Sequence, residues 1–293
     1  MTETLRSERA PETSSVLVTG AAGNLGREIV SRLHARGVRV RGLDRHPVDA
    51  RPGVESVVGD VTDADVLRAS LVGVDAVFLM WPLLDSAPAR TILPELTGAA
   101  RRLVYLSSSA VDGSRARQTD PIVQVHADME ALLEDAGLRP VVLRSDTLAS
   151  NVRGWAAQLR DGDVVAGPEI ARTAVVDERD VAAAAVTAVL ADGDRLGRGP
   201  HVLTGPEVLS RADQVADLGA ALGRRLRFEA VPADLARSQM LADGRPAALV
   251  EALIAAAKHR PGSDRVTDTV ERLTGRPPGT FAQWAADHAP EFR

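Results

Sequence analysis

The chain has 293 residues, 45% of them hydrophobic and 26% charged, which fits one large α/β domain or one domain with a small appendage. Its net charge of −5 argues against a general nucleic-acid-binding protein, because neutralising phosphates requires an excess of basic residues. It contains no cysteine, which excludes disulfides, thiolate metal sites and cysteine nucleophiles. Residues 1–13 are predicted to be a disordered polar tail without a signal core, and no apolar stretch could span a membrane. We therefore expect a cytoplasmic protein that binds neither nucleic acid nor membrane.

Short runs rich in valine and leucine alternate with helical patterns along most of the chain. The predicted strands are 14–19, 38–43, 55–59, 75–80, 103–107 and 139–144. The predicted helices between them are 25–36, 62–70, 87–101 and 122–135. Asp177 is a predicted N-cap of a further, alanine-rich helix. Such alternation predicts a doubly wound parallel α/β sheet of the Rossmann type.

The pattern changes after about residue 205. Helical segments at 211–223 and 232–258 flank a strand-like stretch at 226–231. We therefore expect a nucleotide-binding domain over 14–204 and a small, mostly helical substrate lobe over 205–293. Segment 147–173 is expected to project towards this lobe.

The first predicted strand ends in glycines at the spacing Gly20-x-x-Gly23-x-x-Gly26, and a helix follows. Glycines at such a turn let backbone N–H groups approach a pyrophosphate, and the helix N-terminus adds partial positive charge. Asp44 ends the second strand, where an acidic side chain can accept from an adenosine ribose hydroxyl. Together these features predict binding of NAD(P) through Gly20, Ala22, Gly23, Asn24, Leu25, Gly26 and Asp44.

The preference between NAD and NADP depends on two adjacent side chains. Asp44 would repel a 2′-phosphate and favours NAD, whereas Arg45 would bind that phosphate and favours NADP. The position of Asp44 favours NAD slightly. Asp60 closes the third strand and is predicted to reach the adenine amino group, with Val61 packing on the ring; the alternative is a strand-end turn capped by Asp60.

The sequence resembles the NmrA-like branch of the atypical short-chain dehydrogenase/reductases, which includes quinone and triarylmethane-dye reductases and redox-sensing regulators. The resemblance lies in Thr19-Gly20-Ala21-Ala22-Gly23-Asn24-Leu25-Gly26, in Gly59-Asp60, and in segments 76–82, 103–109, 126–138 and 142–144. It implies that Met80, Trp81 and Pro82 run past the nicotinamide ribose. It also implies that Ser107 and Ser108 lie beside the nicotinamide.

The chain departs from the wider family at its catalytic motif. It contains no Tyr-x-x-x-Lys pair, and Tyr105 and Lys258 are its only tyrosine and lysine. His126 and Glu130 stand at i,i+4 spacing on the corresponding helix, as in NmrA-like members. One interpretation is that His126 contacts the nicotinamide or donates a proton, with Glu130 orienting it and raising its pKa. The other is a structural pair on the helix surface.

Other candidate residues surround the same region. Ser108 matches a position where relatives hydrogen-bond a substrate oxygen, although a satisfied strand-end hydroxyl is the alternative. Trp81, Asn151 and Trp155 could line a pocket for a flat substrate, although most tryptophans simply pack in cores. The six histidines have no metal-ligand spacing, so no metal site is predicted.

These observations favour an NAD(P)H-dependent reductase that passes a hydride to a conjugated or quinone-like small molecule, such as a secondary-metabolite intermediate. The alternatives are a non-catalytic NAD(P)-sensing regulator and a redox-neutral isomerase or cyclase on the same scaffold. The sequence does not specify the substrate or the oligomeric state.

Overall fold

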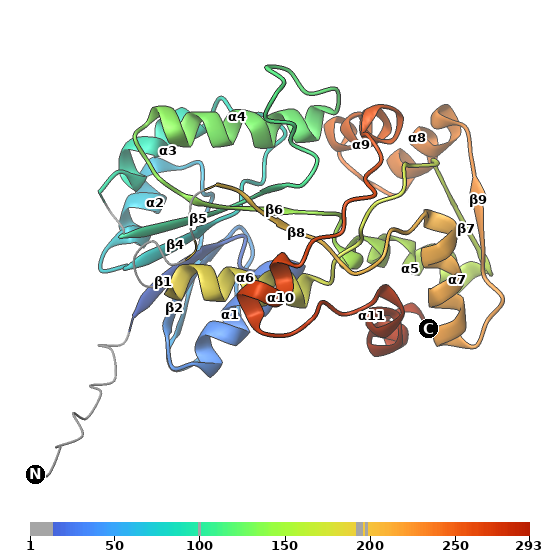
Figure 1. Ribbon diagram of the computed structural model, residues 1–293, viewed down its shortest axis with the longest axis horizontal. Coiled ribbons are helices and arrows are strands. Elements are labelled where there is room, and N and C mark those ends of the chain that lie inside the picture. Colours follow the sequence, from blue (N-terminus) through green and yellow to red (C-terminus); the bar gives the residue numbers. More distant parts are fainter. Residues whose placement is uncertain (1–13, 99–100, 192–195, 197–198) are drawn as a thin grey trace, which may run out of the picture.

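A seven-stranded parallel sheet forms the centre of the protein in the computed structural model, which describes residues 14–98, 101–191, 196 and 199–293 (Figure 1). The predicted tail at 1–13 lies outside these residues. The sheet order is β3-β2-β1-β4-β5-β6-β8, and every neighbouring pair is parallel. The strands are β1 (Ser15–Thr19), β2 (Arg39–Asp44), β3 (Val54–Val58), β4 (Ala76–Leu79), β5 (Arg102–Ser108), β6 (Val141–Ser145) and β8 (His201–Leu203).

The strand order reverses between β1 and β4. The chain builds outward from β1 through β2 to β3 and then returns to the other side of β1 with β4. In open α/β sheets, ligands bind outside the carboxyl ends of the strands at such a switch point. The fold class predicted from the sequence is therefore confirmed, and the glycine turn after β1 lies at this switch point.

Helices cover both faces of the sheet (Figure 1). On one face, α1, α6 and α10 pack on Val16, Val18 and Phe78. On the other, α2, α3 and α4 pack on Leu17, Leu79 and Tyr105. Alternate residues of each strand thus enter opposite cores, as the pleat requires. These helices are α1 (Asn24–Ala35), α2 (Ala64–Leu71), α3 (Ala89–Leu96), α4 (Pro121–Asp135), α6 (Glu178–Leu190) and α10 (Thr269–Thr274).

Aspartates define the beginnings of three of these helices. Asp63, Asp120 and Asp177 each accept a hydrogen bond from a backbone N–H group of the first turn, in α2, α4 and α6 respectively. Such a cap satisfies an amide that the helix itself cannot bond. The predicted N-cap at Asp177 is therefore confirmed.

The remaining elements form a second group beside the sheet (Figure 1). Strand β7 pairs in parallel with β9, and the apolar cluster there includes Trp155, Val165, Leu218 and Trp284. The elements are η1 (Ala149–Trp155), α5 (Ala156–Asp161), β7 (Val164–Gly167), α7 (Arg211–Leu222), β9 (Arg227–Ala230), α8 (Ala233–Ala242), α9 (Ala247–His259), α11 (Phe281–His288) and η2 (Ala289–Phe292).

The structure differs from the sequence analysis at three points in the second half of the chain. The single helix predicted over 232–258 is two helices, because Gly244 adopts φ +78° and Pro246 stands immediately before α9. Strands β7 and β8 were not predicted, and each has no more than four residues. Val270 of α10 packs in the core of the large sheet. The domain division at 204/205 stays a prediction.

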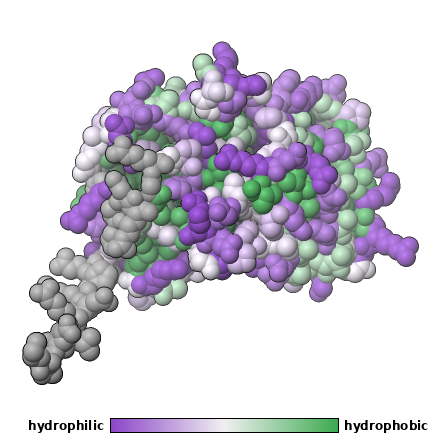
Figure 2. Space-filling view, in the orientation of Figure 1, coloured by the Kyte–Doolittle hydropathy of each residue, from purple (hydrophilic) through white to green (hydrophobic). Residues whose placement is uncertain are grey.

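The surface seen in Figure 2 is a mosaic in which hydrophilic side chains predominate at the edges and a hydrophobic patch lies near the middle. Within the described part of the chain, no helix has the length and apolar character needed to cross a membrane.

Candidate active site

The glycine turn after β1 forms a tight cradle at the switch point. Gly20 has φ +67°, and a Cβ placed on Gly26 would lie 2.1 Å from the carbonyl oxygen of Gly20. Helix α1 begins directly after Gly23, with no side-chain cap and no acidic residue in its first turn. No acidic side chain of α1 itself therefore competes for its N-terminal amides and positive dipole end, which suits a pyrophosphate. Leu25 is buried in the core, while Asn24 accepts from Arg27.

The carboxylate of Asp44, at the end of β2, binds the backbone of the glycine turn. Its two oxygens accept from the backbone N–H of Ala22 at 3.1 Å and of His46 at 2.9 Å. The neighbouring Arg45 is exposed. Asp60 accepts from the backbone and hydroxyl of Thr62. The Thr62 backbone hydrogen bond, with a smaller contribution from Arg45, lowers the pKa of Asp60.

The segment after β4 lies against the cradle. The hydroxyl of Thr19 accepts from the backbone N–H of Met80, and the Met80 side chain occupies the space beside Gly20. Pro82 is exposed. Trp81 is only 6% exposed in the core beneath α3 and α4, and its indole N–H donates to the carbonyl of Asp85.

His126 of α4 contacts the chain's only tyrosine. Its Nδ1 lies 3.1 Å from the hydroxyl oxygen of Tyr105, which is fully buried in β5. Burial, assisted by the charge of Arg260, lowers the pKa of His126 to about 4. Glu130 opposes this shift but is outweighed. Glu130 thus acts in the expected direction on the pKa of His126, but burial makes the net shift downward, and the imidazole is neutral at pH 7.

The hydrogen-bond partners of Glu130 are Ser107 and Arg144 rather than His126. Its carboxylate accepts from the hydroxyl of Ser107 and binds the guanidinium of Arg144, with N–O distances of 3.0 and 2.6 Å. Arg144 also donates to the carbonyl of Val111. This network joins α4 to the carboxyl ends of β5 and β6. Glu130 thus positions the strand ends rather than the imidazole.

A cavity of about 260 Å³ lies at the ends of β5 and β6. Ser108, Ser109, His126, Asn151 and Asp146 are among its lining residues. The hydroxyl of Ser109 donates to Asp146, and burial raises the pKa of that carboxyl. The backbone N–H of Ala110 donates to Ser108 over 3.3 Å, a long hydrogen bond.

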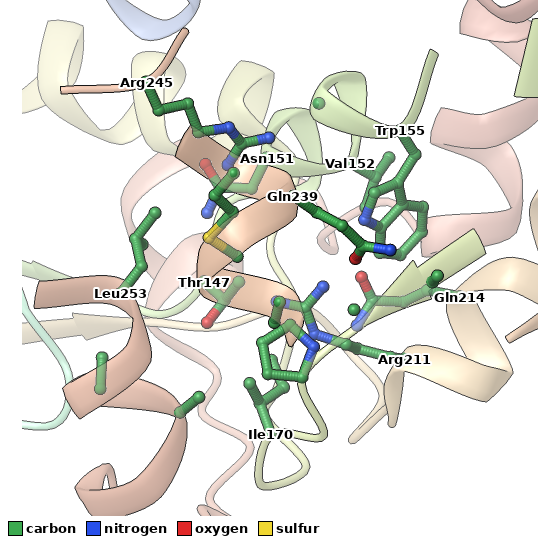
Figure 3. Close-up of a pocket in the computed structure, with 18 of the residues that line it drawn as sticks. Thr147, Asn151, Val152, Trp155, Ile170, Arg211, Gln214, Gln239, Arg245 and Leu253 are labelled. Carbon is green, nitrogen blue, oxygen red and sulfur yellow. The ribbon is translucent and has the colours of Figure 1, made fainter. Parts of the chain in front are cut away.

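A second cavity, of about 360 Å³, adjoins the first and lies among the second group of elements (Figure 3). It shares Thr147, Asn151, Thr173, Leu253 and Arg260 with the first cavity. Asn151 and Trp155, two of the three predicted pocket residues, line it; the third, Trp81, lines neither cavity.

Two functional candidates escaped the sequence analysis. Asp146 directly follows β6. Its position at the carboxyl end of a predicted parallel strand could have identified it as a candidate site residue. Arg260 directly follows α9, 140 residues along the chain from Asp120, whose carboxylate it binds at 2.6 Å. No spacing rule connects these two residues. No group of three histidine, aspartate or glutamate side chains suited to a metal ion occurs within the described part of the chain.

Comparison with known proteins agrees with this geometry. Residues 20–192 match the family model described as NAD(P)H-binding. The chain is 38% identical over 283 residues to (4-alkanoyl-5-oxo-2,5-dihydrofuran-3-yl)methyl phosphate reductase from Streptomyces griseus, covering 94% of this chain and 99% of the relative. It is 30% identical over 291 residues to an NAD(P)H azoreductase from Xenophilus azovorans, with the same coverage.

The chain belongs to the NAD(P)H-binding family, within the atypical short-chain dehydrogenase/reductases. A solved NADPH-dependent quinone oxidoreductase from Escherichia coli, complexed with NADPH, shares the fold at TM-score 0.75 and 21% identity, over 93% of this chain and 99% of that one. The chain is an NAD(P)-dependent oxidoreductase. The relatives do not choose between NAD and NADP, so the slight preference for NAD has no support from them.

Proposed function

We propose that this protein is an NAD(P)H-dependent reductase of a small molecule whose double bond is conjugated with a carbonyl group. The observation that carries the proposal is the placement of the glycine cradle and the Ser108 cavity along one edge of the sheet. The name of the Streptomyces relative specifies a 5-oxo-2,5-dihydrofuran with an alkanoyl group, in which the double bond is conjugated with two carbonyls. Bound NAD(P)H supplies the hydride in such a reduction.

The residues of the cavity suit an acceptor that becomes negatively charged. Adding a hydride to the far carbon of a conjugated carbonyl places charge on the carbonyl oxygen, so donors aimed at that oxygen accelerate the reaction. Ser108 has a hydroxyl whose donor has no partner among the described residues, since its oxygen only accepts from Ala110. His126 lines the same cavity. We assign both to the binding of this oxygen.

The hydrogen bond between Tyr105 and His126 determines which imidazole nitrogen can donate. If Nδ1 carried the proton, the fully buried phenol O–H would have no acceptor. We therefore infer that Tyr105 donates to Nδ1 and that Nε2 carries the proton. His126 then acts as a neutral hydrogen-bond donor, which supports a mechanism without a Tyr–Lys pair.

Asp146 is the carboxyl group of the cavity best suited to hold a proton. Burial raises its pKa, while Arg260 and the hydrogen bonds from Thr147 and Ser109 limit the rise. A carboxyl group with a raised pKa in a cleft is a candidate general acid. We assign to Asp146 the proton that completes the reduction, and to Glu130 the positioning of Ser107.

The test follows NADH and NADPH oxidation with conjugated lactones, quinones and azo dyes as acceptors. We expect turnover with at least one conjugated acceptor, and a loss of roughly tenfold to a hundredfold in kcat for Ser108→Ala and His126→Phe. Ser114→Ala is the matched control, because this exposed serine does not line either cavity. Equal rates in all variants would overturn these assignments.

The same assay separates the alternative functions. A sensor would bind NAD(P)H saturably without oxidising it in the presence of any acceptor. A redox-neutral isomerase would convert its substrate with no net consumption of the nucleotide. Either result would contradict the proposed reductase.

A further inference from the structure

The second cavity is rich in positive charge although the whole chain is acidic. Arg211, Arg245 and Arg260 are among its lining residues, and Asp243 is the only acidic residue that lines it within the described part of the chain. The net charge of the chain is −5. A locally basic cavity in an acidic protein indicates an anionic ligand.

Arg211, the first residue of α7, has no salt-bridge or hydrogen-bond partner for its side chain among the described residues. Its Nε is fully buried without a partner, and its guanidinium lies over the ring of Trp155, 5.8 Å from the ring centroid. Burial lowers the pKa of Arg211, and the nearby Arg245 lowers it further, with Glu169 opposing. Burying a charge without a partner is costly, so this position is unfavourable unless a ligand pairs with it.

Arg245 faces the same cavity from the turn between α8 and α9. Its side chain likewise forms no hydrogen bond or ion pair with the parts of the chain that are described, and it approaches Gly154. Figure 3 shows Gln214 and Gln239 turning their carboxamides towards each other beside the guanidinium of Arg211. Two guanidiniums and these amides are a donor set suited to a multivalent oxyanion.

The phosphates of the dinucleotide are not candidates for this ligand. Their predicted contacts, Gly20 to Gly26 for the pyrophosphate and Arg45 for a 2′-phosphate, line neither cavity. The anion must therefore belong to another molecule. The shared lining residues connect the arginines to the Ser108 cavity, so one substrate can occupy both.

We propose that Arg211 and Arg245 bind a phosphate monoester group of the substrate and hold its conjugated end towards Ser108. The orientation of the substrate's conjugated end towards Ser108 rests on the proposed function. The binding of the anion by the two arginines does not. A phosphate monoester carries nearly two negative charges at pH 7, which matches two unpaired guanidiniums. Thr173, whose buried hydroxyl has no partner within the described residues, lies where the two cavities meet.

The experiment measures the binding of phenyl phosphate by calorimetry and by intrinsic tryptophan fluorescence, with benzoate and phenol as comparison ligands. Wild-type protein is compared with Arg211→Gln and Arg245→Gln. Arg160→Gln is the matched control, because Arg160 is exposed, lines neither cavity and has the same charge. Unfolding temperatures and NADPH titrations verify that each variant is folded.

We expect phenyl phosphate to bind more tightly than benzoate, and phenol to bind most weakly. Each cavity variant should weaken phenyl phosphate binding by roughly tenfold or more, and the control should leave it unchanged. Binding that is absent in the wild type, or equal in the wild type and both cavity variants, would overturn the proposal. Benzoate binding as tightly as phenyl phosphate would also contradict the phosphate assignment.

This test is independent of turnover. If phenyl phosphate binds through Arg211 while no acceptor oxidises NAD(P)H, the anion site stands and the reductase proposal fails. If acceptors are reduced while both arginine variants bind phenyl phosphate as the wild type does, the reductase stands and the anion site fails.

Discussion

The imidazole Nδ1 of His126 lies 3.1 Å from the buried hydroxyl oxygen of Tyr105. Burial raises the pKa of Tyr105 and lowers that of His126 to about 4, so both groups are neutral at pH 7. The residue that the sequence offered as a general acid is therefore uncharged at pH 7. In the proposed reduction we assign the proton instead to Asp146, which lines the same cavity.

This pairing predicts how His126 titrates. In a nitrogen-15 NMR titration we expect the His126 imidazole to stay neutral from pH 8 to about pH 5 and to gain its proton only near pH 4. Tyr105→Phe removes the hydrogen bond to Nδ1 but keeps most of the burial. We expect that variant to stay neutral at pH 7 with a changed tautomer ratio. Protonation of wild-type His126 near pH 6.5 would contradict the assignment.

The same pKa predicts an acid-dependent loss of stability. The unfolded chain protonates His126 near its ordinary pKa of 6.5, above the folded value of about 4. The unfolded state therefore binds more protons between these values, and stability falls as the pH is lowered from about 6.5 to 4. The contribution is at most about 3 kcal/mol, and the partial exposure of His126 reduces it. Urea unfolding of wild type and His126→Gln at pH 7 and pH 4.5 measures it: the variant should lose less stability on acidification, and equal losses would contradict this prediction.

Gly26→Ala tests the glycine cradle. Its new Cβ would lie 2.1 Å from the carbonyl oxygen of Gly20, so the turn and α1 must move apart. We expect a loss of stability of about 1–3 kcal/mol and at least a tenfold loss in NAD(P)H affinity, measured by energy transfer from tryptophan to the nicotinamide. Gly113→Ala is the control, since a Cβ there meets nothing within 4 Å. Unchanged affinity in Gly26→Ala would place the pyrophosphate elsewhere.

The pair of Glu130 and Arg144 is predicted to be structural. Its side chains are only 18% and 15% exposed, so removing one partner leaves a partly desolvated charge. We expect Glu130→Gln to lower the free energy of unfolding by about 2–3 kcal/mol, with part of that loss recovered in the double variant Glu130→Gln/Arg144→Met. Denaturant unfolding of the four proteins in the cycle measures this coupling. Strictly additive effects would show that the pair contributes no interaction of its own.

Cofactor preference is predicted to depend on Asp44 and Arg45. Asp44→Ala should shift binding towards NADPH because it removes repulsion of a 2′-phosphate, whereas Arg45→Ala should shift it towards NADH. Each shift is expected to be about tenfold in the ratio of the two Kd values. Asp44 also accepts from Ala22, so its variant should bind both nucleotides less well. Unchanged ratios in both variants would show that neither side chain faces the 2′ position.

The sequence predicted the sheet well because local patterns determine it. The runs that became β1 to β6 are rich in valine and leucine, most of them are bounded by glycine, proline or aspartate, and the glycine spacing follows β1. Strand β8, with three residues, gives no such periodic signal. Strand β7 is stabilised by its pairing with β9, which is distant in the sequence.

The electrostatics of the site were less predictable, because they depend on contacts between distant segments. The i,i+4 spacing placed His126 and Glu130 on one helix face, but only the tertiary structure pairs Glu130 with Arg144 and His126 with Tyr105. Burial then reversed the direction expected for the pKa of His126. In the same way, no sequence pattern links Arg211 on α7 with Arg245 beyond α8.

The most direct test of the central claim is hydride transfer from nicotinamide deuterated at C4. The purified protein is incubated with the deuterated NADH or NADPH and a conjugated lactone, and the product is examined by mass spectrometry and NMR. With both hydrogens at C4 replaced by deuterium, we predict one deuterium per molecule of product, at the carbon beta to the carbonyl. A product without deuterium, or a nucleotide that is bound but not oxidised by any conjugated acceptor, would contradict the account.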